Sequence, residues 1–272
     1  MYYNLVLVYM LGAMALMMSL TQQVVFLITG SMILYFGWTA DIFITISALI
    51  IRVGVVDPEK FKTVIWETHL PGYAVDRNNP RQFLRPERYL NFMPLAMIVG
   101  LIGSIVIHYY EILGGGIYLV MQVLLIFAFS GIISMRRANL LGPKLKKITI
   151  GVSLFWIVAA TGVLSYFIYA GAMDEIILWG GTIVYMIAIV IMAILTFINY
   201  AYRQRTHGFR LMLCLGAIFF VVSDFIIGFN FFIEPFYLAP LLFYPFWVLA
   251  IFCLQYAVLF LRTKSDTPIF KK

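Results

Sequence analysis

The chain has 272 residues, of which 63% are hydrophobic and 11% charged, and its formal net charge is +7. A mean hydropathy of +0.98 excludes an ordinary soluble domain. The basic pI of 9.4 does not indicate a nucleic-acid partner, because one-sided Lys and Arg loops that contact anionic lipid headgroups account for it.

Apolar stretches long enough to cross a membrane recur along the chain. A spanning helix needs roughly 20 apolar residues at about 1.5 Å of rise each. Such stretches are predicted at residues 2–20, 24–51, 89–107, 117–134, 148–171, 176–201, 211–233 and 240–261. We therefore expect an all-α bundle of eight transmembrane helices in a single domain, residues 1–272. The segment 53–88 is predicted to be a loop insertion, and the three glycines at 114–116 a flexible turn.

The basic residues test the number of spans. With eight spans, all 19 Lys and Arg residues fall on the side that holds the N-terminus, here called side A. They lie in the segments 52–88, 136–147, 203–210 and 262–272. Because Lys and Arg in short loops stay in the cytoplasm, side A is predicted to be cytoplasmic, with both termini on it. The protein is thus predicted to be an integral, multi-pass membrane protein.

No metal or cofactor site is expected from the sequence. The three histidines are scattered, with His69 and His207 in loops on side A and His108 at an outer span end. Cys214 and Cys253 lie in different spans, without a CxxC or Cys/His cluster. This spacing favours buried free thiols.

Two carboxylates lie inside predicted spans, Asp41 in the second and Asp224 in the seventh. A charged side chain in the bilayer costs at least ~2.5 kcal/mol, so such residues face a protein interior and usually mark function. Asp41 lies 11 residues before Arg52, or roughly 16 Å from side A at about 1.5 Å per residue. Asp224 follows Arg210 by 14 residues, or roughly 21 Å. We expect the two acids to lie in one layer of the bundle.

Two carboxylates in a site of low dielectric constant cannot both ionise cheaply, so one is expected to keep its proton while the other stays charged. Such a pair is suited to general acid and base catalysis. The alternative is structural: each Asp is hydrogen-bonded to a hydroxyl group of a neighbouring helix. The sequence does not assign the two catalytic roles.

The seventh span carries the pattern G-A-x-x-F-x-x-S-D in Gly216, Ala217, Phe220, Ser223 and Asp224. This pattern and the number of spans resemble the YhhN-like lysoplasmalogenase family of eight-span membrane proteins. The resemblance implies hydrolysis of the vinyl ether bond of a lysoplasmalogen, which yields a fatty aldehyde and a glycerophospho-headgroup.

The family's earlier intramembrane Gly-Asp motif resembles the context of Asp41, where Ala40 replaces the glycine. Its later His-Tyr motif is similar to His108 with the tyrosines that follow it. On this basis Asp41 and Asp224 are the expected catalytic residues. The expected substrate-binding residues are Thr39, Arg81, Arg85, Arg88, His108, Arg203, Arg205 and Ser223. The expected partner is a membrane lipid of the lysophospholipid class, with the Arg residues near its phosphate on side A.

Two other classes of protein remain open. A proton- or cation-coupled transporter would also bury two Asp residues, but would be expected to show broken helices in both halves. A receptor or a subunit of a membrane complex would use the two acids for helix packing or for contact with a protein partner, which the sequence does not identify.

Overall fold

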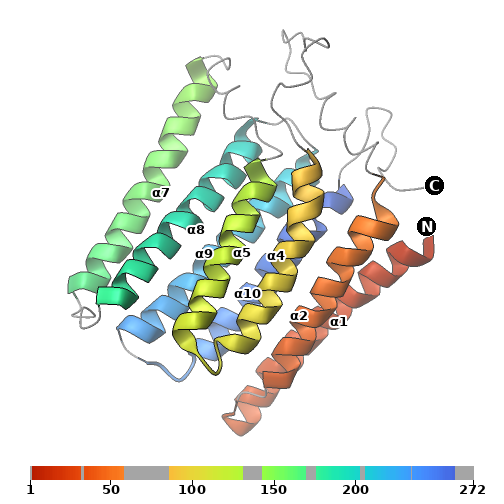
Figure 1. Ribbon diagram of the computed structural model, residues 1–272, viewed down its shortest axis with the longest axis horizontal. Helices are drawn as coiled ribbons and strands as arrows, with labels where there is room; N and C mark the ends of the chain where they lie inside the picture. Colours follow the sequence, from red (N-terminus) through yellow and green to blue (C-terminus); the bar gives the residue numbers. More distant parts are fainter. Residues whose placement is uncertain are drawn as a thin grey trace.

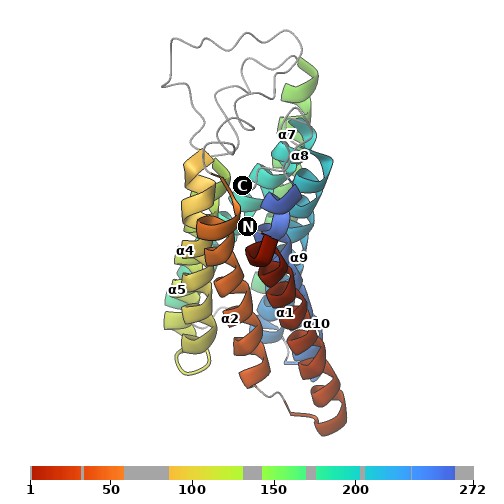
Figure 2. The same ribbon diagram turned by 90° about the vertical axis from the view of Figure 1, so that its right-hand side faces the viewer.

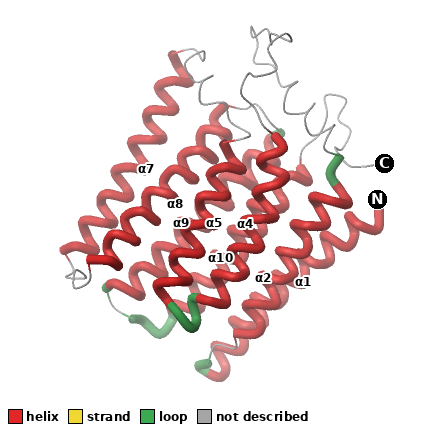
Figure 3. The backbone as a smooth tube through the Cα atoms, in the orientation of Figure 1, coloured by secondary structure: helices red, strands yellow, loops and turns green. Residues whose placement is uncertain are grey.

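The computed structural model describes residues 2–31, 34–57, 86–130, 143–169, 176–202, 206–233 and 235–260. Within these segments the chain is helical and forms no strand (Figure 3). Eight of the helices are long and apolar enough to cross a membrane. The prediction of an all-α bundle with eight spans is confirmed, and the chain is a multi-pass membrane protein.

The spanning helices follow the apolar stretches of the sequence. They are α1 (Tyr2–Thr29), α2 (Leu34–Ile50), α4 (Pro86–Val106), α5 (Glu111–Ser130), α7 (Pro143–Tyr169), α8 (Ile176–Tyr202), α9 (His207–Phe232) and α10 (Ala239–Tyr256). Two short helices extend α2 and α10 on side A, the π-helix η1 (Ile51–Val55) and the 3-10 helix η2 (Ala257–Phe260). Of the predicted insertion 53–88, the first residues belong to η1 and the last to α4, and residues 58–85 lie outside the described segments.

Six of these helices form a closed ring, in which each packs against the next in the order α2, α4, α5, α8, α9, α10 and back to α2. Outside the ring, α1 packs against α2 and α10. At the opposite edge of the bundle, α7 packs against α8 (Figures 1 and 2). The spanning part of α7 is 6% buried, compared with 61% for α10. We infer that α7 faces lipid over most of its surface, whereas α10 is a central helix.

Hydrogen bonds to backbone carbonyls join the helices on side A. The hydroxyl of Tyr256 donates to the carbonyl of Val8 at 2.7 Å, and that of Tyr89 to Leu254 at 2.9 Å. Gly12 permits the first contact, because a Cβ at this position would lie 2.5 Å from the Tyr256 hydroxyl oxygen. The first bond ties α1 to α10, the first and last helices of the chain, and the second ties α4 to α10.

The boundary between the first two spans differs from the prediction. The polar pair Gln22 and Gln23 was expected to lie in the break between them, but both lie inside α1 and are buried. Gly30 provides the true end of the helix, since its φ of +68° is a conformation that other residues rarely adopt. Two adjacent buried glutamines inside a membrane helix thus give the same polar signal in the sequence as a loop between two spans.

The prediction of a turn at 114–116 was also wrong. These glycines lie in the first turns of α5, and the connection between α4 and α5 is formed by residues 107–110. Gly114 is buried, and a Cβ there would overlap the backbone of Ile107. Its role is therefore close packing rather than chain flexibility.

Candidate functional site

The carboxylate of Asp41 lies inside the ring, and each of its oxygens accepts a hydrogen bond. Its Oδ2 accepts a hydrogen bond from Ser104 Oγ of α4 at 2.6 Å, and its Oδ1 accepts one from Trp247 Nε1 of α10 at 3.1 Å. The residue is only 4% exposed. Three helices thus meet at one acid, as expected for an ionisable group that must be satisfied by protein in the absence of water.

From Ser104 the polar contacts continue into α5. The hydroxyl of Tyr118 lies 2.9 Å from Ser104 Oγ, and its ring packs edge-on against Trp247 with centroids 5.2 Å apart. Tyr118 also interacts electrostatically with both Asp41 and Asp224. Its phenol is therefore within electrostatic reach of both acids.

Asp224 occupies the other side of the ring, on α9. The hydroxyl of Tyr185 on α8 donates to its Oδ2 at 3.1 Å, and Asp224 is half-buried. The neighbouring Ser223 is fully buried, and its Oγ donates to the carbonyl of Phe243 at 3.1 Å. Ser223 therefore joins α9 to α10. Its predicted role in binding substrate stays a prediction.

Two buried polar groups near these acids lack a hydrogen-bond partner. Gln122 follows Tyr118 by one helical turn on α5, and neither its Oε1 nor its Nε2 is bonded. Its amide lies near the hydroxyl of Tyr185 without forming a well-aligned hydrogen bond to it. The hydroxyl of Tyr244 on α10 is also unpaired and interacts electrostatically with Asp41. Buried polar groups without a hydrogen-bond partner are rare in proteins and indicate a place for water or a ligand.

The two acids do not contact each other through a hydrogen bond. In the described part of the chain no hydrogen bond joins the carboxylates, and each has its own donors. On α5, Tyr118 lies beside Ser104, the donor to Asp41, and Gln122 lies near Tyr185, the donor to Asp224. The glycines near the acids serve other contacts: Gly37 accommodates Tyr244, whose hydroxyl would be 2.7 Å from a Cβ there, and Gly228 faces Phe167.

The other predicted site residues that the structure describes make no hydrogen bond to either acid. Thr39 bonds back to the carbonyl of Tyr35 in its own helix at 2.6 Å. His108 is exposed at the outer α4–α5 turn, where its ring lies 6.4 Å from that of Trp38. Arg88 is half-buried in the first turn of α4, at side A. Arg81, Arg85, Arg203 and Arg205 lie outside the described residues.

Sequence reasoning missed the donors to the acids, Ser104, Trp247 and Tyr185, and the nearby polar residues Tyr118 and Gln122. Most of them are residue types that occur commonly in membrane helices, so their presence carries little signal. Gln122 is the exception, as the one amide side chain of α5. In the described segments no three His, Cys, Asp or Glu residues lie together as a metal site would require.

The family model described as the YhhN family matches residues 81–258. The chain belongs to the YhhN family. The match runs from the segment before α4 to η2, and it includes Asp224 with all the polar partners described above. The helices α1 and α2, and with them Asp41, precede it. No curated protein and no solved structure matches this YhhN-family chain.

Proposed function

We propose that this YhhN-family protein is a membrane-embedded hydrolase that cleaves the vinyl ether bond of lysoplasmalogens, with Asp41 and Asp224 as its acid and base. The observation that carries the proposal is that the ring holds two polar clusters, Asp41 with Ser104 and Tyr118, and Asp224 with Tyr185, and that Tyr118 is within electrostatic reach of both acids. Side A is proposed to be the cytoplasmic side, with both termini on it.

The proposed reaction adds one water across the ether. A carboxylic acid protonates the vinyl carbon distal to the oxygen, and the resulting oxocarbenium ion is attacked by water as a carboxylate removes a proton. The hemiacetal then breaks its bond to the glycerol oxygen, which takes up a proton. The products are a fatty aldehyde and a glycerophospho-alcohol, and the chemistry needs only two carboxyl groups and one water.

The hydrogen bonds favour one assignment of roles. Asp41 accepts two hydrogen bonds, and donors to a carboxylate stabilise its charge. We therefore assign Asp41 the role of the base, whose negative charge also stabilises the oxocarbenium ion. Asp224 accepts one hydrogen bond and is assigned the acid. Tyr118 holds Ser104, which donates to Asp41, and its phenol is within electrostatic reach of Asp224.

Gln122 is suited to holding the attacking water, because its unpaired amide offers a donor and an acceptor between the two tyrosines. We expect Gln122→Leu to lower kcat by about 100-fold, the cost of misplacing a reactant by about 1 Å, with KM little changed. The matched control is Gln22→Leu, since Gln22 is also buried and unpaired but lies on α1, outside the ring. Equal kcat values in the two variants would contradict this role for Gln122.

The function itself is tested with the purified, full-length protein in lipid vesicles that contain a lysoplasmalogen. We expect release of free aldehyde, measured with a carbonyl-reactive dye. The matched control substrate has a saturated alkyl ether in the same position, which cannot be protonated on carbon. Absence of aldehyde from the vinyl ether, with the protein folded, would overturn the proposal. Equal release from both ethers would also exclude it.

A further inference from the structure

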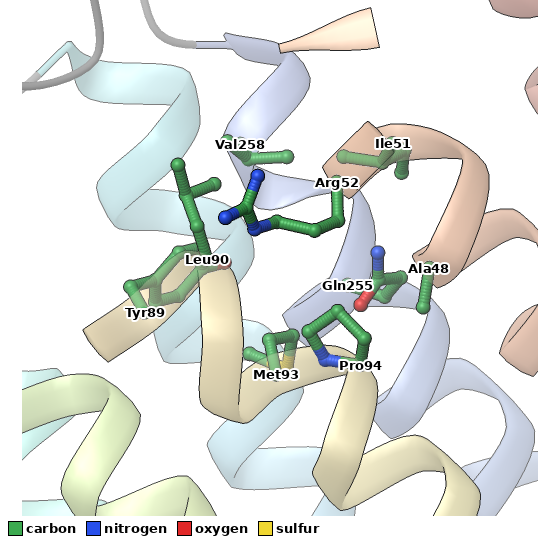
Figure 4. A pocket seen from close by; sticks show the side chains of 9 residues that line it. All are labelled: Ala48, Ile51, Arg52, Tyr89, Leu90, Met93, Pro94, Gln255 and Val258. Carbon is green, nitrogen blue, oxygen red and sulfur yellow. The ribbon is translucent and has the colours of Figure 1, made fainter. Parts of the chain in front are cut away.

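A pocket opens at the side A ends of α2, α4 and α10 (Figure 4). About 200 Å³ of space lies within the pocket and its open mouth, and most of the walls are apolar. The enclosed part has room for about one water molecule. Besides Tyr89, two polar side chains line it, Arg52 from η1 and Gln255 from α10. The same three helices carry Asp41, Ser104 and Trp247 deeper in the bundle.

Arg52 presents a positioned and partly unused guanidinium to this pocket. Its Nε donates to Asn91 Oδ1 at 2.9 Å, which fixes the orientation of the group. Among the described residues neither of its terminal nitrogens has a hydrogen-bond partner. In Figure 4 the guanidinium extends across the pocket toward Leu90 and Val258. Arg52 lies in a π-helix, a rare element that is common at functional sites.

The deeper part of the pocket offers unsatisfied acceptors. Gln255 is 2% exposed, and its Oε1 is buried without a hydrogen-bond partner. In Figure 4 its amide lies next to Pro94. Pro94 interrupts α4 and has no N–H for the carbonyl of Leu90, its usual helical partner. The pocket therefore combines a cation at its mouth with acceptors behind it.

We propose that this pocket binds the phosphate-ester headgroup of a single-chain phospholipid. The terminal nitrogens of Arg52 donate to the phosphate oxygens at the mouth, and Gln255 accepts an O–H from a water molecule in the enclosed part of the pocket. The site deepens the proposed function and rests on it. Arg52 lies 11 residues beyond Asp41 along one helical path, roughly 16 Å at about 1.5 Å per residue. The headgroup site and Asp41 therefore lie on the same helical path, with the headgroup site nearer to side A.

Binding is tested without turnover, in the full-length protein carrying both Asp41→Asn and Asp224→Asn. The probe is a tritiated lysophosphatidylethanolamine with an acyl chain, which lacks the vinyl ether, measured by scintillation proximity. We expect Arg52→Gln to weaken binding by roughly tenfold to a hundredfold, the loss of a charge-assisted hydrogen-bonded pair. The matched control is Lys147→Gln, which removes an exposed charge on side A from α7.

Three further ligands identify what the pocket recognises. A monoacylglycerol with the same chain should bind equally well with and without the Arg52→Gln substitution, because it has no phosphate. Glycerophosphoethanolamine and inorganic phosphate, which have no chain, should compete only weakly. If free phosphate competes as strongly as the lipid, the pocket recognises phosphate alone, and the proposal of a lipid headgroup is overturned.

If Arg52→Gln is not recovered folded, Asn91→Ala replaces it, since Asn91 is exposed and orients the guanidinium. Unchanged lipid binding in the folded Arg52 or Asn91 variant would overturn the headgroup site. Because no bond is cleaved in this assay, its outcome is independent of whether Asp41 and Asp224 catalyse hydrolysis.

Discussion

Replacing either Asp41 or Asp224 by Asn is expected to abolish aldehyde release, with kcat lowered by about 1,000-fold or more. The substitution preserves the shape of the side chain but removes the group that carries the proton or the charge, and proton transfer by a positioned side chain typically contributes about 10²–10⁴ to the rate. Because the two acids act in one reaction, the double variant is expected to be about as inactive as either single variant.

The measurement is aldehyde release from a lysoplasmalogen, with folding checked by size-exclusion chromatography and thermal unfolding. Glu111→Gln is the matched control, because Glu111 is an exposed carboxylate at the outer end of α5. It should retain activity. A folded Asp41→Asn protein with full activity would show that Asp41 is not catalytic and leave Asp224 as the one catalytic acid. A fully active double variant would show that neither acid catalyses hydrolysis.

Gly114→Ala is expected to lower the free energy of unfolding by about 1–3 kcal/mol, the usual cost of overpacking. The added methyl group would overlap the Cα and Cβ of Ile107 and lie 2.6 Å from its backbone nitrogen. Since a backbone cannot rotate away as a side chain can, the α4–α5 hairpin must open. Ser104 and Tyr118 lie on the two arms of this hairpin, so activity should fall as well.

The adjacent Gly115 provides the control. A Cβ at this position has nothing within 4 Å. Gly115→Ala is therefore expected to be neutral or stabilising by up to about 1 kcal/mol, because Ala favours helix over Gly. Thermal unfolding of both variants in the same detergent gives the comparison. An unchanged unfolding temperature for Gly114→Ala would show that the hairpin is looser than described.

Hydropathy was sufficient to predict the eight spans, because each needs about 20 apolar residues and few alternatives satisfy that length. It failed where a local signal had two meanings. Gln22 and Gln23 looked like a break but are buried in α1, and the glycines at 114–116 looked like a turn but allow helices to pack. Both errors arise because contacts between helices decide whether such residues lie in a helix or in a loop, and these contacts cannot be predicted from the neighbouring sequence.

The two acids could be singled out from the sequence, because a carboxylate inside a span is costly without a reason. Their partners could not, since which Ser, Tyr or Trp meets an acid depends on how six helices close into a ring. From the sequence, Arg52 is only a charge that anchors a loop. Its contact with Asn91 and its place beside Gln255 become visible only with helix packing.

The donors to Asp41 come from far along the chain, 63 residues later for Ser104 and 206 residues later for Trp247. During synthesis, α2 leaves the ribosome long before α10 exists. The acid therefore enters the bilayer with its binding partners still untranslated. A chain that terminates before Trp247 would keep an unsatisfied carboxylate in the lipid, which makes truncated products targets for membrane quality control.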